Sequence, residues 1–200
     1  MRWVVTGPAF GVMLGAVDSV VNHVPEWLGE VGTARAERGG WSQLAEFASL
    51  NLDAGWAWAA AAVLAGWLVS RRSGLTAGVR RGAVSGALCL VFATAAYYGM
   101  DILFDGGVWW TMTTRIWLAA GLVFGPALGI AGAVIHRGGI AGVLAALLVP
   151  AGAALQMVLL PPAAESLMAQ PVRWTVWAGA AAATILIVRR AGRSSTDPAR

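Results

Sequence analysis

The sequence contains no lysine, and only 12% of its 200 residues are charged. All 14 basic residues are therefore arginines, and the formal net charge is +4. Soluble globular domains carry about 25% charged residues, whereas here 58% of the chain is hydrophobic. The composition thus excludes a soluble globule and predicts an integral membrane protein. Because the arginines mostly lie just outside apolar runs, the positive charge indicates membrane topology and not a nucleic-acid surface.

Cysteine and histidine are also scarce. Cys89 is the only cysteine and lies within an apolar run, which excludes an intrachain disulfide and a cysteine metal site. The two histidines, His23 and His136, are expected on opposite sides of the membrane, so we do not expect a histidine metal site. The sequence also lacks a Walker loop, a G-x-S-x-G elbow and an H-E-x-x-H motif. We therefore expect no metal and no cofactor.

Six apolar segments approach the length of about 20 residues that a helix needs to cross a bilayer. The first segment extends beyond a signal-peptide core and has no A-x-A-like cleavage site, so we expect it to be retained. The expected fold is all-α: a polytopic membrane protein with a bundle of about six transmembrane helices. Residues 1–190 would form one domain and residues 191–200 a disordered cytoplasmic tail. The six segments are residues 3–22, 53–70, 82–103, 114–135, 139–160 and 172–188.

The longest connection joins the first two predicted spans. Within it, the stretch WSQLAEFASLNL has apolar residues at helical spacing and begins with a tryptophan. This pattern is typical of a short helix that lies in the membrane interface or re-enters the membrane. We expect such a helix between the first and second spans.

The arginines are distributed asymmetrically about the predicted spans. Four of them, Arg35, Arg38, Arg115 and Arg173, fall on one side, and the other ten fall on the side of both termini. Since positively charged loops stay in the cytoplasm, both termini are predicted to be cytoplasmic in the cell membrane. All acidic residues except Asp197 fall toward the outer half. Polar chemistry is therefore expected at the outer end.

Glycines recur every four residues in three spans, which places them on one face of each helix. Such faces let helix backbones approach closely and gain dispersion contacts. Close helix packing is the simpler interpretation, and room for a ligand between helices is the other. The three series are Gly7, Gly11 and Gly15; Gly78, Gly82 and Gly86; and Gly121, Gly125 and Gly129.

Ionisable and aromatic residues gather where the third span turns into the fourth. Tyr97 and Asp101 are four residues apart and share a helix face, with Tyr98 beside them. Ionisable groups inside the membrane are costly and commonly functional. A structural alternative is an ion pair between Asp101 and Arg115, with Trp109 and Trp110 as interfacial belt residues. We favour a functional role for Asp101, because an ion pair would not require an acid inside the span.

Two further acids lie near the same end of the predicted bundle. Asp18 and Asn22 share a face of the first span. Asn51 and Asp53 precede the second span and its Trp56. For Asp53, a role as the helix N-cap is as plausible as a functional one.

Four short motifs carry a resemblance to a known family: Asn51 with Trp56, the tetrapeptide AAYY at residues 95–98, RIW at residues 115–117 and GPALG at residues 125–129. Over residues 45–150 the chain resembles a family of small actinobacterial integral membrane proteins. Within that family it is similar to the integral-membrane terpene cyclases of drimentine-type pathways, which act on a farnesyl chain attached to an indole diketopiperazine. The resemblance implies cation–olefin cyclisation that is initiated by protonation, without a metal or a diphosphate site.

That chemistry requires a protonated carboxylic acid in a pocket of low dielectric, π-faces that stabilise carbocations, and a base. The chain contains eleven tryptophans, most of them predicted toward the outer half. The candidate proton donors are Asp101, our first choice, and Asp53 and Asp18. The candidate substrate-binding residues are Asn22, Asn51, Trp56, Tyr97, Tyr98, Trp109, Trp110, Arg115 and Trp117.

The function predicted from sequence is thus an isomerase-type terpene cyclase whose partners are the lipid bilayer and a hydrophobic prenylated small molecule, not a nucleic acid. Two alternatives come from other classes. A small transporter or channel-like protein would use Asp18, Asp101 and Arg115 for ion movement, but it would need acids throughout the membrane depth. A non-catalytic membrane assembly protein would explain the glycine series but not the buried acids.

Overall fold

The computed structural model describes residues 3–195, which form α-helices joined by short connections. Two 3-10 turns, Arg35–Glu37 and Ile135–Arg137, precede α2 and α6. In chain order the helices are α1 (Trp3–Trp27), α2 (Gly40–Leu52), α3 (Gly55–Ser70), α4 (Leu75–Asp105), α5 (Met112–Val134), α6 (Gly139–Leu159) and α7 (Ala169–Ser195).

Five of these helices, α1, α4, α5, α6 and α7, are long and apolar enough to cross a membrane. The pair α2 and α3 provides a sixth candidate span if the two helices are taken together, although they are bent by 60° relative to each other. The protein is therefore a multi-pass membrane protein with an all-α fold. This confirms the predicted fold class, including the additional helix between the first two spans.

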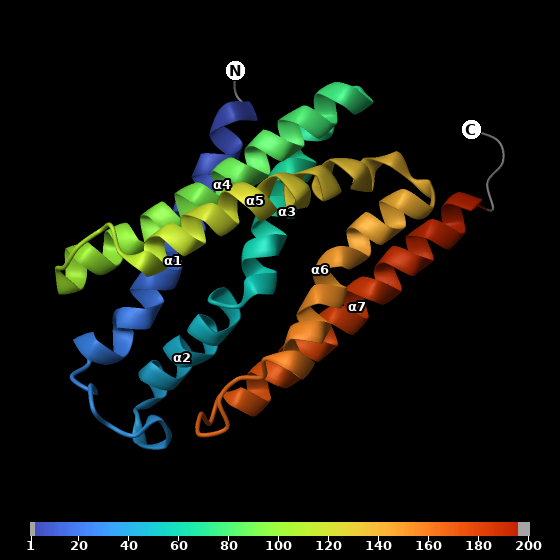
Figure 1. The fold of residues 1–200 in the computed structure, drawn as a ribbon. Coiled ribbons are helices and arrows are strands. Elements are labelled where there is room, and N and C mark those ends of the chain that lie inside the picture. Colours follow the sequence, from blue (N-terminus) through green and yellow to red (C-terminus); the bar gives the residue numbers. More distant parts are fainter. Residues whose placement is uncertain (1–2, 196–200) are drawn as a thin grey trace.

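The connections between helices lie at two opposite ends of the bundle (Figure 1). The α1–α2, α4–α5 and α6–α7 connections lie at one end, toward the lower left of the view. The α3–α4 and α5–α6 connections lie at the other end, together with the N-terminal end of α1 and the C-terminal end of α7. We call the first of these the aspartate end, because Asp18, Asp53, Asp101 and Asp105 lie toward it.

The break between α2 and α3 falls at Asp53 and Ala54. Asp53 ends α2, where its backbone N–H donates to the Ser49 carbonyl oxygen, and Ala54 is the N-cap of α3 without a side-chain hydrogen bond. The interpretation of Asp53 as the N-cap of the second span is therefore wrong. Since the carboxylate is not used as a cap, it is available for other contacts.

Glycines allow α1, α4 and α5 to pack with their backbones in contact. A Cβ atom at Gly11 would overlap the Cys89 carbonyl oxygen, and one at Gly15 would overlap that of Ala93. In the same way, Gly129 of α5 meets Gly82 of α4. The packing interpretation of the glycine series is confirmed at these positions. It does not hold at Gly78, where a Cβ atom would have room, since its nearest neighbour would lie 3.4 Å away.

α6 and α7 form a hairpin that packs on α2 and α3. Its buried side chains, Ala153, Met157, Val172 and Val176, contact Phe47, Leu50 and Trp56. At its far end α7 continues to Ser195, so the prediction that the disordered tail begins at residue 191 is wrong. Alanine and arginine favour helix, and Arg193 in the last turn complements the helix dipole. Residues 196–200 of the predicted tail lie outside the described residues.

Candidate functional site

A cavity of about 510 Å³ lies between α3, α4, α5 and α6. This volume is within the range of about 300–1,000 Å³ that is typical of small-molecule sites. Its wall is almost entirely apolar, and Asp53 is its only charged lining residue within the described part of the chain. The cavity is lined by Asp53, Gly55, Trp58, Ala59, Leu90, Thr94, Tyr97, Tyr98, Trp117, Ala120, Gly121, Phe124, Ala127, Leu128 and Leu148.

Five aromatic side chains line this cavity. The rings of Trp58 and Tyr97 lie 6.4 Å apart and are tilted by 59°. Tyr97 and Tyr98 pack edge to face, with their centroids 5.2 Å apart. Trp117 and Phe124 lie on the α5 side of the cavity. The π-faces therefore come from three helices and surround one apolar volume.

The cavity reaches the surface of the bundle between α5 and α6. Phe124 of α5 is 61% exposed and Leu148 of α6 is 44% exposed, although both line the cavity. The cavity is therefore open at the apolar outer surface of these two helices.

Asp18 lies next to Asp53, the charged residue of the cavity wall. Its side chain is fully buried, and neither carboxyl oxygen has a partner at hydrogen-bond distance among the residues that the structure describes. The Asp53 carboxyl group and the Trp58 indole are its polar neighbours, and Asp101 also interacts with it electrostatically. The three aspartates predicted from sequence thus come together, although they belong to α1, the α2–α3 break and α4.

Hydrogen bonds connect this cluster to its surroundings. The Asn22 amide nitrogen Nδ2 lies 3.2 Å from Asp53 Oδ2 and 2.9 Å from the Tyr97 hydroxyl oxygen, and it donates to both. The Ser19 hydroxyl donates to Asp101 Oδ1 at 2.6 Å. Asp53 therefore faces the cavity, while Asp101 is held by Ser19 and does not line it.

Arg115 is exposed and makes no ion pair with Asp101 among residues 3–195. Asp105 contacts His23 instead, and Glu46 pairs with Arg35. The alternative of an ion pair between Asp101 and Arg115 is therefore wrong. Of the three carboxyl groups only that of Asp18 is fully buried, whereas Asp101 is half-buried and Asp53 is exposed.

Several residues predicted to bind substrate lie outside the cavity lining. Asn51 donates to the Phe47 carbonyl oxygen within α2, and Trp56 packs on the α6–α7 hairpin. The Trp109 ring lies beside Gly99 of α4. Trp110 is 61% exposed, as expected for an interfacial residue. The structure places Tyr97, Tyr98 and Trp117 in the cavity wall and Asn22 beside it.

Trp58, one of the tryptophans predicted toward the outer half, also lines the cavity. The sequence analysis missed Thr94, which lines the cavity, and Ser19, whose hydroxyl group donates to Asp101. One wall of the cavity is formed by α5, whose lining residues recur at the spacing of one helix face. These residues, Trp117, Ala120, Gly121, Phe124, Ala127 and Leu128, could have been recognised by that spacing, but apolar periodicity is also typical of ordinary packing.

The fold and the site define a class of protein: a multi-pass membrane protein with an open apolar cavity and a cluster of carboxyl groups at one end. The chain belongs to a family of unknown function, DUF6518, whose model matches residues 39–199. No curated protein matches the chain. No solved structure matches it either.

Proposed function

We propose that this protein is an integral-membrane terpene cyclase that carries out proton-initiated cation–olefin cyclisation of a prenylated substrate, such as a farnesyl-bearing indole diketopiperazine. One observation carries the proposal: a carboxyl group, Asp53, stands at the polar end of an apolar, aromatic-lined cavity that opens toward lipid. The prenyl chain would occupy the cavity, and the polar part of the substrate would lie near Asn22 at the aspartate end.

Asp53 is the proposed proton donor, because it is the aspartate that lines the cavity. Asp18 supports it as a proton store. A buried carboxyl group without a counter-ion is more stable in its neutral, protonated form, and the carboxyl group of Asp18 is a direct neighbour of that of Asp53. Asp101, the first choice from sequence, has a secondary role in this proposal, because it accepts a hydrogen bond from Ser19 and is not among the cavity-lining residues.

The reaction is an isomerisation in which atoms and charge balance. The Asp53 carboxyl proton adds to one carbon of the terminal alkene, so that a C–H bond forms and the other carbon becomes a tertiary cation. Neighbouring alkenes then attack in turn, and each attack forms a C–C bond and moves the cation along the chain. Loss of a proton from carbon forms the final alkene, and the proton returns to the aspartate cluster.

The aromatic wall supports the cationic steps. A cation over the face of tryptophan or tyrosine is stabilised by about 2 kcal/mol or more when water is excluded. Trp58, Tyr97 and Trp117 contribute such faces from three sides of the cavity. The apolar lining also keeps water from trapping the cation before ring closure.

We also propose that both termini are cytoplasmic, which places the aspartate end at the outer side of the membrane. The support is the distribution of arginines, ten of which fall on the side of the termini. A hydrophobic substrate would then reach the cavity from the outer half of the bilayer.

A transport function remains the second candidate from sequence, but the cavity does not favour it. An ion path would need polar groups along the membrane depth. Apart from Asp53, the cavity is lined mostly by apolar side chains such as Leu90, Phe124 and Leu128.

Turnover by purified protein in lipid vesicles tests the proposal. The wild-type protein should convert a farnesylated indole diketopiperazine into products of the same mass with fewer alkenes, detected by mass spectrometry and NMR. Asp53→Asn keeps the shape of the side chain but cannot donate a carboxyl proton, so turnover should fall by about 10²- to 10⁴-fold.

The matched control is Glu165→Gln, which removes an exposed carboxyl group in the α6–α7 connection and should leave turnover unchanged. Near-normal turnover by Asp53→Asn would reject Asp53 as the donor. Binding of the substrate without any conversion by the wild type would reject the cyclase assignment.

A further inference from the structure

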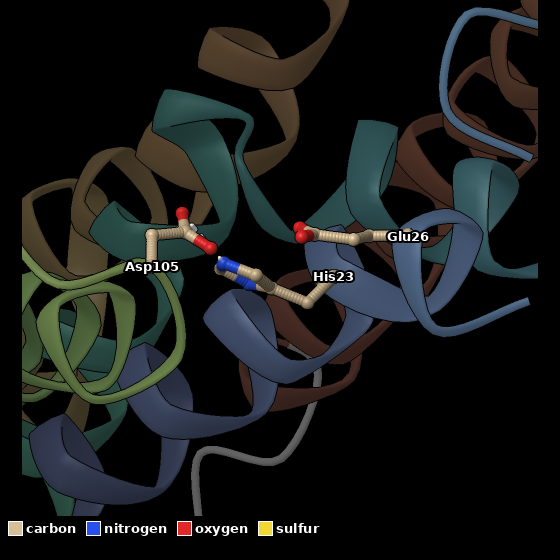
Figure 2. Close-up of side chains that lie close together, drawn as sticks. All are labelled: His23, Glu26 and Asp105. Atoms are coloured by element: carbon tan, nitrogen blue, oxygen red, sulfur yellow. Dashed lines mark hydrogen bonds and ion pairs between the residues drawn. The ribbon is translucent and has the colours of Figure 1, made fainter. Parts of the chain in front are cut away.

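A second polar cluster lies at the aspartate end, outside the cavity. His23 and Glu26 are three residues apart on α1, and Asp105 is the last residue of α4. Figure 2 shows the three side chains pointing toward one another, with the imidazole of His23 between the two carboxylates. The histidine nitrogen and one oxygen of each carboxylate all lie within 4.8 Å of one another.

Both nitrogens of the His23 ring face hydrogen-bond acceptors. Nδ1 lies 2.7 Å from the Ser19 carbonyl oxygen, which can only accept, so Nδ1 must carry a hydrogen. Nε2 lies 3.1 Å from Asp105 Oδ2. In the neutral ring that donates from Nδ1, Nε2 has no hydrogen, and its lone pair points at a carboxylate. The contact becomes favourable when a positive charge, either a second ring proton or a metal ion, lies on the Nε2 side.

The surroundings of His23 resemble those of a metal-binding imidazole. Metal-binding histidines commonly donate their other ring nitrogen to a backbone carbonyl, which fixes the tautomer and the orientation of the ring. The Ser19 carbonyl oxygen provides this contact for His23. The Phe104 ring packs edge-on against the imidazole at 4.8 Å, and Trp27 packs on Phe104 at 5.1 Å. The imidazole is thus buried against aromatic rings, while both carboxylates are exposed.

We propose that His23 Nε2, Glu26 and Asp105 bind a divalent transition-metal ion, with Zn²⁺ as the best fit. One imidazole nitrogen and two carboxylate oxygens are ligands that Zn²⁺ uses at about 2.0–2.2 Å, with water in the fourth position. Mg²⁺ and Ca²⁺ prefer oxygen ligands alone, so the imidazole disfavours them. Tetrahedral binding brings ligand atoms to roughly 3.4 Å from one another, and the exposed Glu26 side chain can make this small adjustment.

The proposed metal would join the end of α1 to the end of α4. None of its three ligands lines the cavity, so the ion would not contact the substrate. Ser19 links the two sites, because its carbonyl oxygen contacts His23 and its hydroxyl group contacts Asp101. The role of the ion is therefore to fix the helix ends beside the aspartate cluster. The metal site does not depend on the proposed cyclase activity, and either can fail without the other.

Zinc titration of the purified, metal-stripped full chain in detergent tests this site. Calorimetry should show one Zn²⁺ bound per chain, and the midpoint of thermal unfolding should rise with Zn²⁺ concentration, because the ion binds only the folded state. Co²⁺ in place of Zn²⁺ should give visible absorption of a site with nitrogen and oxygen ligands. Glu26→Gln and Asp105→Asn should each weaken binding by roughly tenfold or more, and His23→Gln should abolish it.

His136→Gln is the matched control, because His136 is exposed at the opposite end of the bundle. It should leave the binding curve unchanged. Glu26→Gln alters an exposed side chain, so its binding can be measured on folded protein even if His23→Gln fails to fold. Absence of saturable binding, equal binding by Glu26→Gln and wild type, or loss of binding in His136→Gln would each overturn the proposal.

Discussion

At the scale of single residues, Asp18 is the most unusual group in the molecule. It is fully buried, and neither of its oxygens is at hydrogen-bond distance from a partner among the described residues. Burying a polar group without such a partner costs about 1–3 kcal/mol. An apolar side chain at this position would stabilise the fold without this cost. The proposed role as a proton store beside Asp53 explains why a carboxyl group, and not an apolar side chain, occupies this position.

Replacement of this residue separates function from stability. Asp18→Asn retains the volume of the side chain but removes its acidic proton. We expect turnover to fall by about 10²-fold or more. The midpoint of unfolding in detergent should stay nearly the same, because the carboxyl group makes no hydrogen bond that is lost. Product formation and thermal unfolding of the same preparation check both expectations.

Asp101→Asn provides the comparison. An asparagine can still accept the Ser19 hydrogen bond, and Asp101 does not line the cavity, so the loss of turnover should be much smaller. The opposite order, with Asp101→Asn inactive and Asp18→Asn active, would return the role of proton donor to Asp101.

At the scale of helices, α5 combines two functions on different faces. Gly125 and Gly129 face α4, where they allow close backbone contact. Phe124 and Leu128 line the cavity. The motif GPALG contributes to both faces, since Ala127 is also a lining residue. The glycine contacts therefore fix the position of the helix that carries one wall of the proposed site.

Close packing of α1 on α4 makes a prediction about stability. Gly11→Ala should destabilise the protein by about 1–3 kcal/mol, because the added methyl group overlaps the Cys89 carbonyl oxygen. Gly152→Ala in α6 is the control, since a Cβ atom there meets nothing within 4 Å. That change should be neutral or slightly stabilising. Thermal unfolding in detergent measures both, and equal midpoints for the two variants would contradict the proposed packing.

At the scale of the whole molecule, the sequence predicted the parts of the fold that apolar length and spacing determine. Six apolar segments and the amphipathic stretch before Asp53 were enough to predict the bundle and α2. The same information could not show that Asp53 faces a cavity or that Asp105 pairs with His23. These contacts join residues far apart in the chain, and they depend on how α1, α3 and α4 cross. For the same reason, apolar cavity residues such as Phe124 could not be distinguished from packing residues.

The arrangement of the helix ends predicts a topology. Reporter fusions after Ala36, in the α1–α2 connection, and after Gly138, at the start of α6, should report opposite sides of the membrane, with Gly138 cytoplasmic. This follows because the two connections lie at opposite ends of the bundle and Arg137 lies beside Gly138. Reporters that indicate the same side would contradict both the orientation and the outer position of the aspartate end.

The central claim is that a carboxyl proton starts the cyclisation, and isotope labelling of the product tests it most directly. The purified protein is incubated with a farnesylated indole diketopiperazine in D₂O, and the product is analysed by mass spectrometry and NMR. We predict one deuterium atom at the carbon that receives the initiating proton, and at least about 10²-fold less product from Asp53→Asn. A cyclised product without deuterium, or a labelled product formed equally fast by Asp53→Asn, would contradict the account.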